Sequence, residues 1–168
     1  MWLASLGRVA FYESEYPIAR ALWEESLEIV RELGDRVRVA IVLNNLGALA
    51  SEQGDYAASE ASYKEGLAIR RQLGDKEGIA TLEGYAALVA ARSNSLHAAR
   101  TWGAAERLRD EIGSSLPPNA RPIYDRRVTT ARAALRDDAA FDRAWQEGRV
   151  LTLEQAIELA LQETVEQP

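Results

Sequence analysis

Two carboxylate pairs and a single histidine are the residues of this chain that could perform acid–base chemistry. Glu24 and Glu28 lie one helical turn apart, Asp137 and Asp138 are adjacent, and His97 is the one histidine. Paired carboxylates can act as acid and base, and a histidine can activate a neighbouring nucleophile. No nucleophile motif accompanies His97, and a chain with 27% charged residues places most carboxylates on solvated helix faces. We interpret both pairs as surface charge and His97 as a surface or turn residue.

The composition excludes most other chemistry. Cysteine is absent, which removes disulfides, thiolate ligands and cysteine nucleophiles, and the 11 glycines form no phosphate-binding loop. The 20 basic and 26 acidic residues give a net charge of −6, which argues against nucleic acid or an anionic membrane as a direct partner. We see neither a membrane-spanning apolar run nor a signal peptide. We therefore expect a cytoplasmic, non-catalytic protein without a cofactor or a metal.

The elements that must position any site come from an internal repeat. Residues 1–40 align with residues 41–80 without a gap, and 14 of the 40 positions are identical, where chance would give about three or four. A third, eroded copy follows, in which Asn94-Ser95 replaces the turn at Gly54-Asp55 and Ile112-Gly113 closes the unit one residue early. The sequence therefore predicts three repeats, at 1–35, 36–75 and 76–113.

Each repeat is predicted to fold as two helices. Between residues 16 and 33, apolar and small residues recur at intervals of three and four, which marks one face of a helix. Gly34 and Gly74 suit the left-handed residue that ends a helix, and the aspartate after each can cap the next one. We expect an all-α fold, with three helical hairpins stacked as a right-handed α-α superhelix.

The remaining third of the chain is predicted to close this stack. The Ser-Ser-Leu-Pro-Pro stretch at 114–118 indicates a turn or short linker. Residues 119–168 then predict capping helices, over 119–135, over 137–147 with Gly148 as its end, and after Thr152, whose hydroxyl and Gln155 fit a capping box. A terminal amphipathic helix covers the last apolar face of an open helical stack.

Several of these residues resemble the tetratricopeptide (TPR) repeat. The resemblance rests on Leu6-Gly7 and Leu46-Gly47 in the first helices, on Gly54 and Tyr56 at a turn, and on Trp23 and Tyr63 in the second helices. It covers residues 1–113, and the period of forty is similar to the longer-helix variety of the family. It implies a TPR-like solenoid that works as a scaffold for a protein or peptide partner.

The tail carries a second, narrower resemblance. Residues Phe141 to Ala156, with Trp145, Gly148-Arg149 and Thr152-Leu153, are similar to the extreme C-terminus of large bacterial ATPase and LuxR-type transcriptional regulators. This implies the sensor or interaction module of such a regulator, with upstream domains of the same polypeptide as a possible partner. A start inside a predicted helix, at Met1-Trp2-Leu3, fits a fragment.

In TPR arrays the first helices line a concave groove, and the residue before each Leu-Gly faces that groove. The resemblance therefore implies these groove residues: Ser5, Arg8, Tyr12, Asn45, Tyr85 and Arg92. The Asn45 carboxamide could hold a peptide backbone or, equally, bond to a neighbouring helix. The arginines would add charge for an acidic ligand. The lysine and asparagine set of chaperone-binding TPR domains is not reproduced.

Aromatic residues and the first helix leave other functions open. Trp23, Tyr63 and Trp102 fall at matching places in successive second helices, which favours core packing over a ligand-stacking stripe. Phe141 and Trp145 are interpreted as the docking face of the cap. An apolar edge around Trp2, Leu3 and Leu6 could pair with a second copy as a homodimer. A small-molecule sensor is a further alternative.

Overall fold

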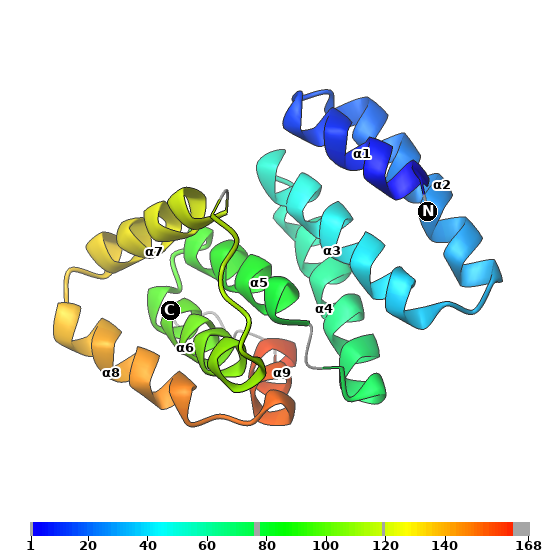
Figure 1. The fold of residues 1–168 in the computed structure, drawn as a ribbon. Coiled ribbons are helices and arrows are strands. Elements are labelled where there is room, and N and C mark those ends of the chain that lie inside the picture. The colour runs from blue at the N-terminus through cyan, green and yellow to red at the C-terminus, as the bar shows by residue number, and fades with distance from the viewer. Residues whose placement is uncertain (1, 76–77, 119, 163–168) are drawn as a thin grey trace. The chain divides into compact units, whose positions relative to one another are not determined.

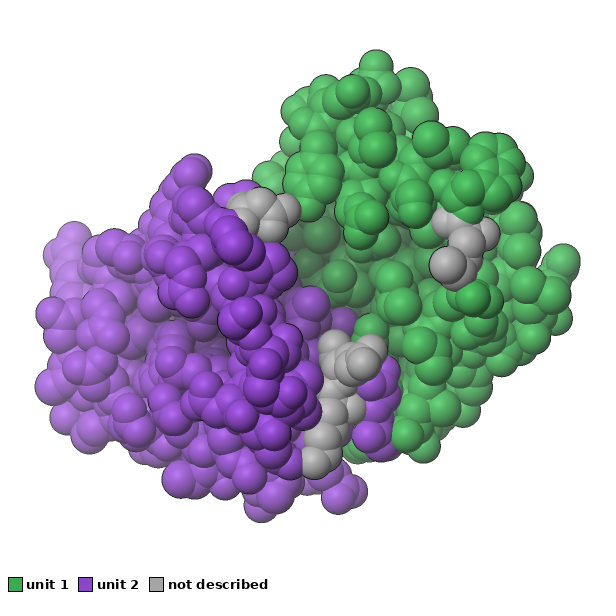
Figure 2. All heavy atoms as spheres, in the orientation of Figure 1, with its two compact units in different colours: residues 1–73 green, residues 74–168 purple. Residues whose placement is uncertain are grey.

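The repeat predicted from the sequence appears as successive helical hairpins in a computed structural model, which describes residues 2–75, 78–118 and 120–162 (Figure 1). The described residues contain no strand and form these helices: α1 (Trp2–Tyr12), α2 (Tyr16–Glu32), α3 (Arg36–Glu52), α4 (Tyr56–Leu73), α5 (Ile79–Ala91), α6 (Ser95–Ile112), α7 (Arg121–Leu135), α8 (Asp138–Arg149) and α9 (Leu153–Leu161). The predicted all-α helical repeat fold is confirmed. The chain divides into two compact units, residues 1–73 and 74–168, coloured separately in Figure 2.

Unit 1 contains two hairpins, α1–α2 and α3–α4, joined by turns of the predicted kind. Gly34 and Gly54 have φ of 68° and 75°, a left-handed conformation that glycine adopts without steric cost. The residue after each glycine caps the next helix. The Asp35 carboxylate accepts from the backbone N–H of Arg38 at 3.0 Å, and the Asp55 carboxylate accepts from that of Ala58 at 3.1 Å.

An aromatic ring lies against a glycine in each hairpin of unit 1. A Cβ atom added at Gly7 would lie 2.5 Å from the Trp23 indole nitrogen, and one at Gly47 would lie 2.9 Å from the Tyr63 ring. Trp23 is 2% exposed and donates its indole N–H to the carbonyl of Ala4 at 3.0 Å. The rings therefore fill the space that the missing side chains leave, and the predicted core role of Trp23 and Tyr63 is confirmed.

Unit 2 combines the α5–α6 hairpin with α7, α8 and α9. Trp102 and Phe141 are fully buried in its core, as expected for a core aromatic and for the docking face of a cap. The Thr152–Gln155 capping box predicted at the start of α9 is present. Gly148, predicted to end a helix, lies inside α8 instead, because α8 continues to Arg149.

Gly148 is needed where α8 crosses α6. A Cβ atom at Gly148 would lie 2.0 Å from the Arg100 carbonyl oxygen, and one at Gly103 would lie 2.1 Å from the Trp145 carbonyl oxygen. Both neighbours are backbone atoms, so neither can move aside cheaply. The two helix backbones therefore approach as closely as they do only because both crossing points are glycines.

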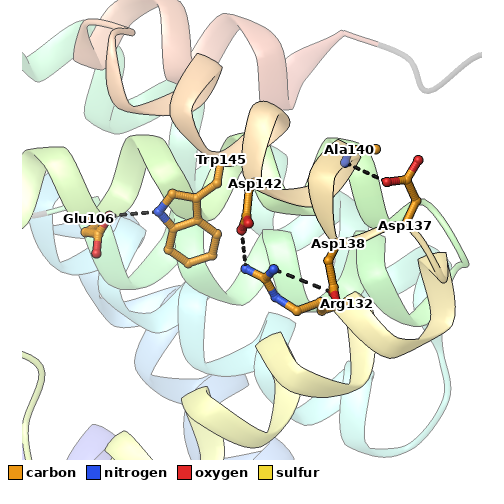
Figure 3. Close-up of polar contacts among 7 residues, drawn as sticks. All are labelled: Glu106, Arg132, Asp137, Asp138, Ala140, Asp142 and Trp145. Atoms are coloured by element: carbon orange, nitrogen blue, oxygen red, sulfur yellow. Dashed lines mark hydrogen bonds and ion pairs between the residues drawn. The ribbon is translucent and has the colours of Figure 1, made fainter.

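Polar contacts fix the same crossing, as Figure 3 shows. Trp145 points toward α6 and donates its indole N–H to the Glu106 carboxylate at 2.8 Å. Arg132 of α7 bonds the Asp142 carboxylate of α8 at 2.6 Å, and its guanidinium lies 4.5 Å from the centre of the Phe141 ring. These contacts hold α7 and α8 in place around the hairpin.

The third hairpin lies one residue out of register with the forty-residue period. Ser93 has the left-handed φ of 65° that Gly54 has in the second hairpin, and Asn94 caps α6 as Asp55 caps α4. The alignment of Asn94 with Gly54 is therefore wrong by one position. The same shift explains why the third repeat ends one residue early, at Ile112-Gly113.

Gly103→Ala is expected to destabilise the protein by about 2 kcal/mol, because the new methyl group meets backbone of α8. The sign is diagnostic, since glycine to alanine inside an exposed helix normally stabilises it by about 1 kcal/mol. Equilibrium denaturant unfolding of both proteins measures the difference. A variant as stable as the parent would contradict the close crossing.

Candidate functional site

Four of the six predicted groove residues lie in unit 1. Ser5, Arg8 and Tyr12 are exposed and follow one another on α1 at spacings of three and four, so they share one face of that helix. Asn45 lies on α3, in the register position that Ser5 occupies in the first repeat. α1 and α3 are in contact and lie side by side (Figure 1). These four residues therefore belong to one surface of unit 1.

Two apolar residues on α3 extend this surface. Val37 and Ile41 precede Asn45 at intervals of four, and they remain 45% and 44% exposed. Neither residue is among those expected from the resemblance, although their intervals of four from Asn45 can be seen in the sequence. We name the surface the α1–α3 face and define it by Ser5, Arg8, Tyr12, Val37, Ile41 and Asn45.

Asn45 is the polar side chain that α3 contributes to the α1–α3 face. Its side chain is partly buried and forms no hydrogen bond with another described residue. The alternative in which Asn45 bonds to a neighbouring helix is therefore not observed here. A carboxamide in that state still offers an acceptor and two donors to a ligand.

Side chains of the second helices, α2 and α4, fix the backbone of α1 and α3 on the side opposite the α1–α3 face. The Gly7–Trp23 and Gly47–Tyr63 contacts set how closely α1 and α3 lie on their second helices. The fully buried Ser59 also donates its hydroxyl to the Gly47 carbonyl at 2.8 Å. Asn45 is two residues from that anchored backbone, so its position is set by packed elements and not by a loop.

Tyr85 and Arg92 lie in unit 2 and are placed differently. Arg92 is exposed at the C-terminal end of α5. Tyr85 is 0% exposed, and its ring forms a T-shaped contact with His97 of α6, so the expectation that it lines a groove is corrected. The register shift of one residue explains the error, because Tyr85 then matches Leu46, which packs against the core, and not Asn45.

Unit 2 contains a hollow among its described residues. It has a volume of about 680 Å³ and is walled by apolar side chains, including Ile79, Ile112 and Leu116. Its charged residues, Glu83 and Arg109, form a two-point ion pair at 2.6 and 2.7 Å with each other. Since each neutralises the other, the hollow presents a ligand with little unsatisfied charge.

The aspartate pair and the histidine named as acid–base candidates take part in helix capping or ion pairing. The Asp137 carboxylate caps α8 by accepting from the Ala140 N–H at 2.9 Å, and Asp138 lies 3.7 Å from the Arg132 guanidinium. His97 donates its backbone N–H to Asn94, which caps α6. No described group of three or more acidic, histidine or cysteine residues could hold a metal ion. Likewise, no described helix is long and apolar enough to cross a membrane.

Comparison with known proteins agrees with the geometry of unit 1. Residues 1–72 match a family model described as the tetratricopeptide repeat. A search of curated proteins and a search of solved structures gave no match. The matched residues end one position before the boundary of unit 1 at residue 73. The hairpins of this unit are therefore similar to TPR repeats, a class of repeat that generally mediates interactions between proteins.

Tyr124 of α7 gives unit 2 a measurable pH response. Burial, and then the nearby Glu83 and Glu106 carboxylates, raise the pKa of the Tyr124 phenol well above its usual value of 10.0. The folded state therefore keeps the proton that the unfolded state releases above about pH 10, so stability is full below that pH and falls above it. Between pH 9 and 11, the free energy of unfolding of the Tyr124→Phe variant is therefore expected to fall by about 1 kcal/mol less than that of the parent.

Urea unfolding at several pH values tests this expectation. Tyr12→Phe is the matched control, because the Tyr12 side chain is 69% exposed. Equal pH slopes in the parent and the Tyr124 variant would contradict the assigned burial of the phenol.

Proposed function

We propose that this chain is a non-catalytic interaction scaffold that binds an extended peptide segment of a partner protein on the α1–α3 face. The observation that supports it most directly is the Asn45 carboxamide, which has no bond to another described residue and lies on a largely exposed face. Asn45 would hold the peptide backbone. Val37, Ile41 and the Tyr12 ring would contact apolar side chains, and Arg8 would pair with an acidic one.

The C-terminal residues suggest the kind of protein in which this scaffold works. The similarity of residues Phe141 to Ala156 to the C-termini of bacterial transcriptional regulators favours a sensor or interaction module of a larger signalling protein. The bound segment would then come from a partner or from other domains of the same polypeptide. The hollow in unit 2 gives weaker support to the small-molecule alternative, because Glu83 and Arg109 already satisfy each other.

Selection of peptides from a random display library against the intact chain tests the proposed face. Enriched peptides are expected to combine an acidic residue with apolar ones. Asn45→Ala is expected to weaken their binding about fivefold, since one hydrogen bond contributes about 1 kcal/mol. Arg8→Glu is expected to weaken it by a similar factor or more, because the variant repels the acidic residue.

Arg71→Glu is the matched control for the charge change. Arg71 is also exposed in unit 1, on α4, away from the α1–α3 face. Titration of a labelled peptide by fluorescence anisotropy gives the affinities of all variants. If the selected peptides bind the Asn45 and Arg8 variants as tightly as the parent, the face is wrongly assigned.

A further inference from the structure

The side of the first hairpin that faces away from α3 and α4 combines exposed apolar residues with carboxylates. Its apolar members on α1 are Trp2, Leu6 and Val9, which are 70%, 45% and 52% exposed, and on α2 it includes Ile29 at 42%. Three exposed glutamates accompany them. We name this surface the α1–α2 edge and define it by Trp2, Leu6, Val9, Glu13, Glu25, Ile29 and Glu32.

The forty-residue period shows what a covered edge of this kind looks like. The equivalents of Trp2 and Val9 in the second hairpin are Val42 and Leu49, which are only 2% and 0% exposed. The equivalents of Leu6 and Ile29, namely Leu46 and Ile69, pack against the core cluster that contains Leu27 and Val30 of α2. A helix with an apolar stripe, α2, therefore covers on the second hairpin what is exposed on the first.

Arginines complete the covered edge. Arg20 and Arg31 of α2 donate to Gln53 and to Glu65 of α4, both at 2.7 Å. Arg36, at the start of α3, donates to Gln72 of α4. The segment that covers the second hairpin, α2 and the start of α3, thus carries three arginines. The second is 11 residues after the first and the third is five residues after the second, and each donates to a side chain of the second hairpin.

The acceptors have equivalents on the α1–α2 edge. Forty residues before Gln53, Glu65 and Gln72 lie Glu13, Glu25 and Glu32. All three are exposed, and none forms an ion pair with another described residue. Two of the three positions are neutral amides in the covered edge and carboxylates in the exposed one, so the exposed edge attracts an arginine more strongly.

We propose that the α1–α2 edge is a docking surface for a basic amphipathic helix of a partner protein. That helix has the pattern of α2: an apolar stripe that covers Trp2, Leu6 and Val9, and arginines about three helical turns apart that pair with Glu13 and Glu25. A third basic residue just beyond its end pairs with Glu32. The surface is distinct from the α1–α3 face, so this inference does not rest on the proposed function.

A second copy of the chain does not fit this edge well. Two copies meeting edge to edge would bring the apolar residues together, but they would also place the glutamates of one copy near those of the other, and like charges at an interface oppose association. The far side of the third hairpin does not supply the arginines either. There α6 carries Gly103, Glu106 and Asp110 at the positions of Glu24, Leu27 and Arg31 in α2, and α8 covers them. We therefore favour a basic partner helix as the occupant of this edge, and the homodimer stays an untested prediction.

A peptide of residues 15–37 of this chain serves as the probe, with Trp23→Ser so that it cannot replace α2 over Gly7. The probe carries a fluorophore and is titrated with the intact protein. Saturable binding is expected, and Glu13→Arg, Glu25→Arg and Glu32→Arg together should weaken it at least tenfold, because each exposed ion pair contributes up to about fivefold. High salt should weaken it as well.

Charge-matched controls make the result specific. A triple variant with Asp125→Arg, Glu154→Arg and Glu158→Arg changes the net charge equally but lies in unit 2, and it should bind the probe as the parent does. We call the edge of the variant with Glu13→Arg, Glu25→Arg and Glu32→Arg the reversed edge. A probe with Arg20→Glu, Arg31→Glu and Arg36→Glu should bind the reversed edge better than the parent edge. If the affinity of the probe is the same for the parent edge and the reversed edge, the proposal is overturned.

A second measurement covers the case in which the isolated probe is too short to form a helix. Because the period has no gap, a second copy of residues 1–40 placed directly before Met1 brings its own α2 equivalent to the edge. Denaturant unfolding should then show added stability that the reversed edge removes. No added stability together with no probe binding overturns the proposal. Self-association of the parent that the reversed edge abolishes would also overturn it, in favour of a second copy.

Discussion

The close contact between a glycine of the first helix and an aromatic ring of the second is the constraint on which unit 1 depends. Because Gly7 and Gly47 have no side chain, the rings of Trp23 and Tyr63 lie directly on the backbone of α1 and α3. That contact sets the separation of the paired helices. It also determines which residues turn outward, so the α1–α3 face and the α1–α2 edge both follow from it.

The repeat made the hairpins and most of the core predictable from the sequence. The spacing of apolar residues, the left-handed glycines and the capping aspartates are local features. They can be recognised from residues close together in the sequence, without knowledge of the fold. Tyr85 was misplaced because identity in the third copy is too low to reveal a shift of one residue. On a helix, one residue is a rotation of about 100°, which is enough to move a side chain from surface to core.

The remaining features depend on contacts between segments far apart in the chain. Nothing local to Gly148 distinguishes a helix end from a helix crossing, since glycine suits both. The distinction comes from Arg100, 48 positions earlier, whose carbonyl lies where a side chain would be. The α1–α2 edge is intermediate: Glu13, Glu25 and Glu32 are visible in the sequence, but their meaning emerges only once Arg20 and Arg31 are seen bonding to the equivalent positions.

The crossing of α6 by α8 has a consequence for how such an array can change in length. In unit 1 the outward stripe of α2 receives the next hairpin, whereas α8 occupies the corresponding stripe of α6 through Gly103 and Glu106. A repeat inserted after α6 would have to displace a helix locked to it by two glycines. Duplication during evolution, or extension by engineering, therefore meets different obstacles at the two places: a hairpin added behind α6 must displace α8, whereas none of the described helices covers the α1–α2 edge ahead of α1.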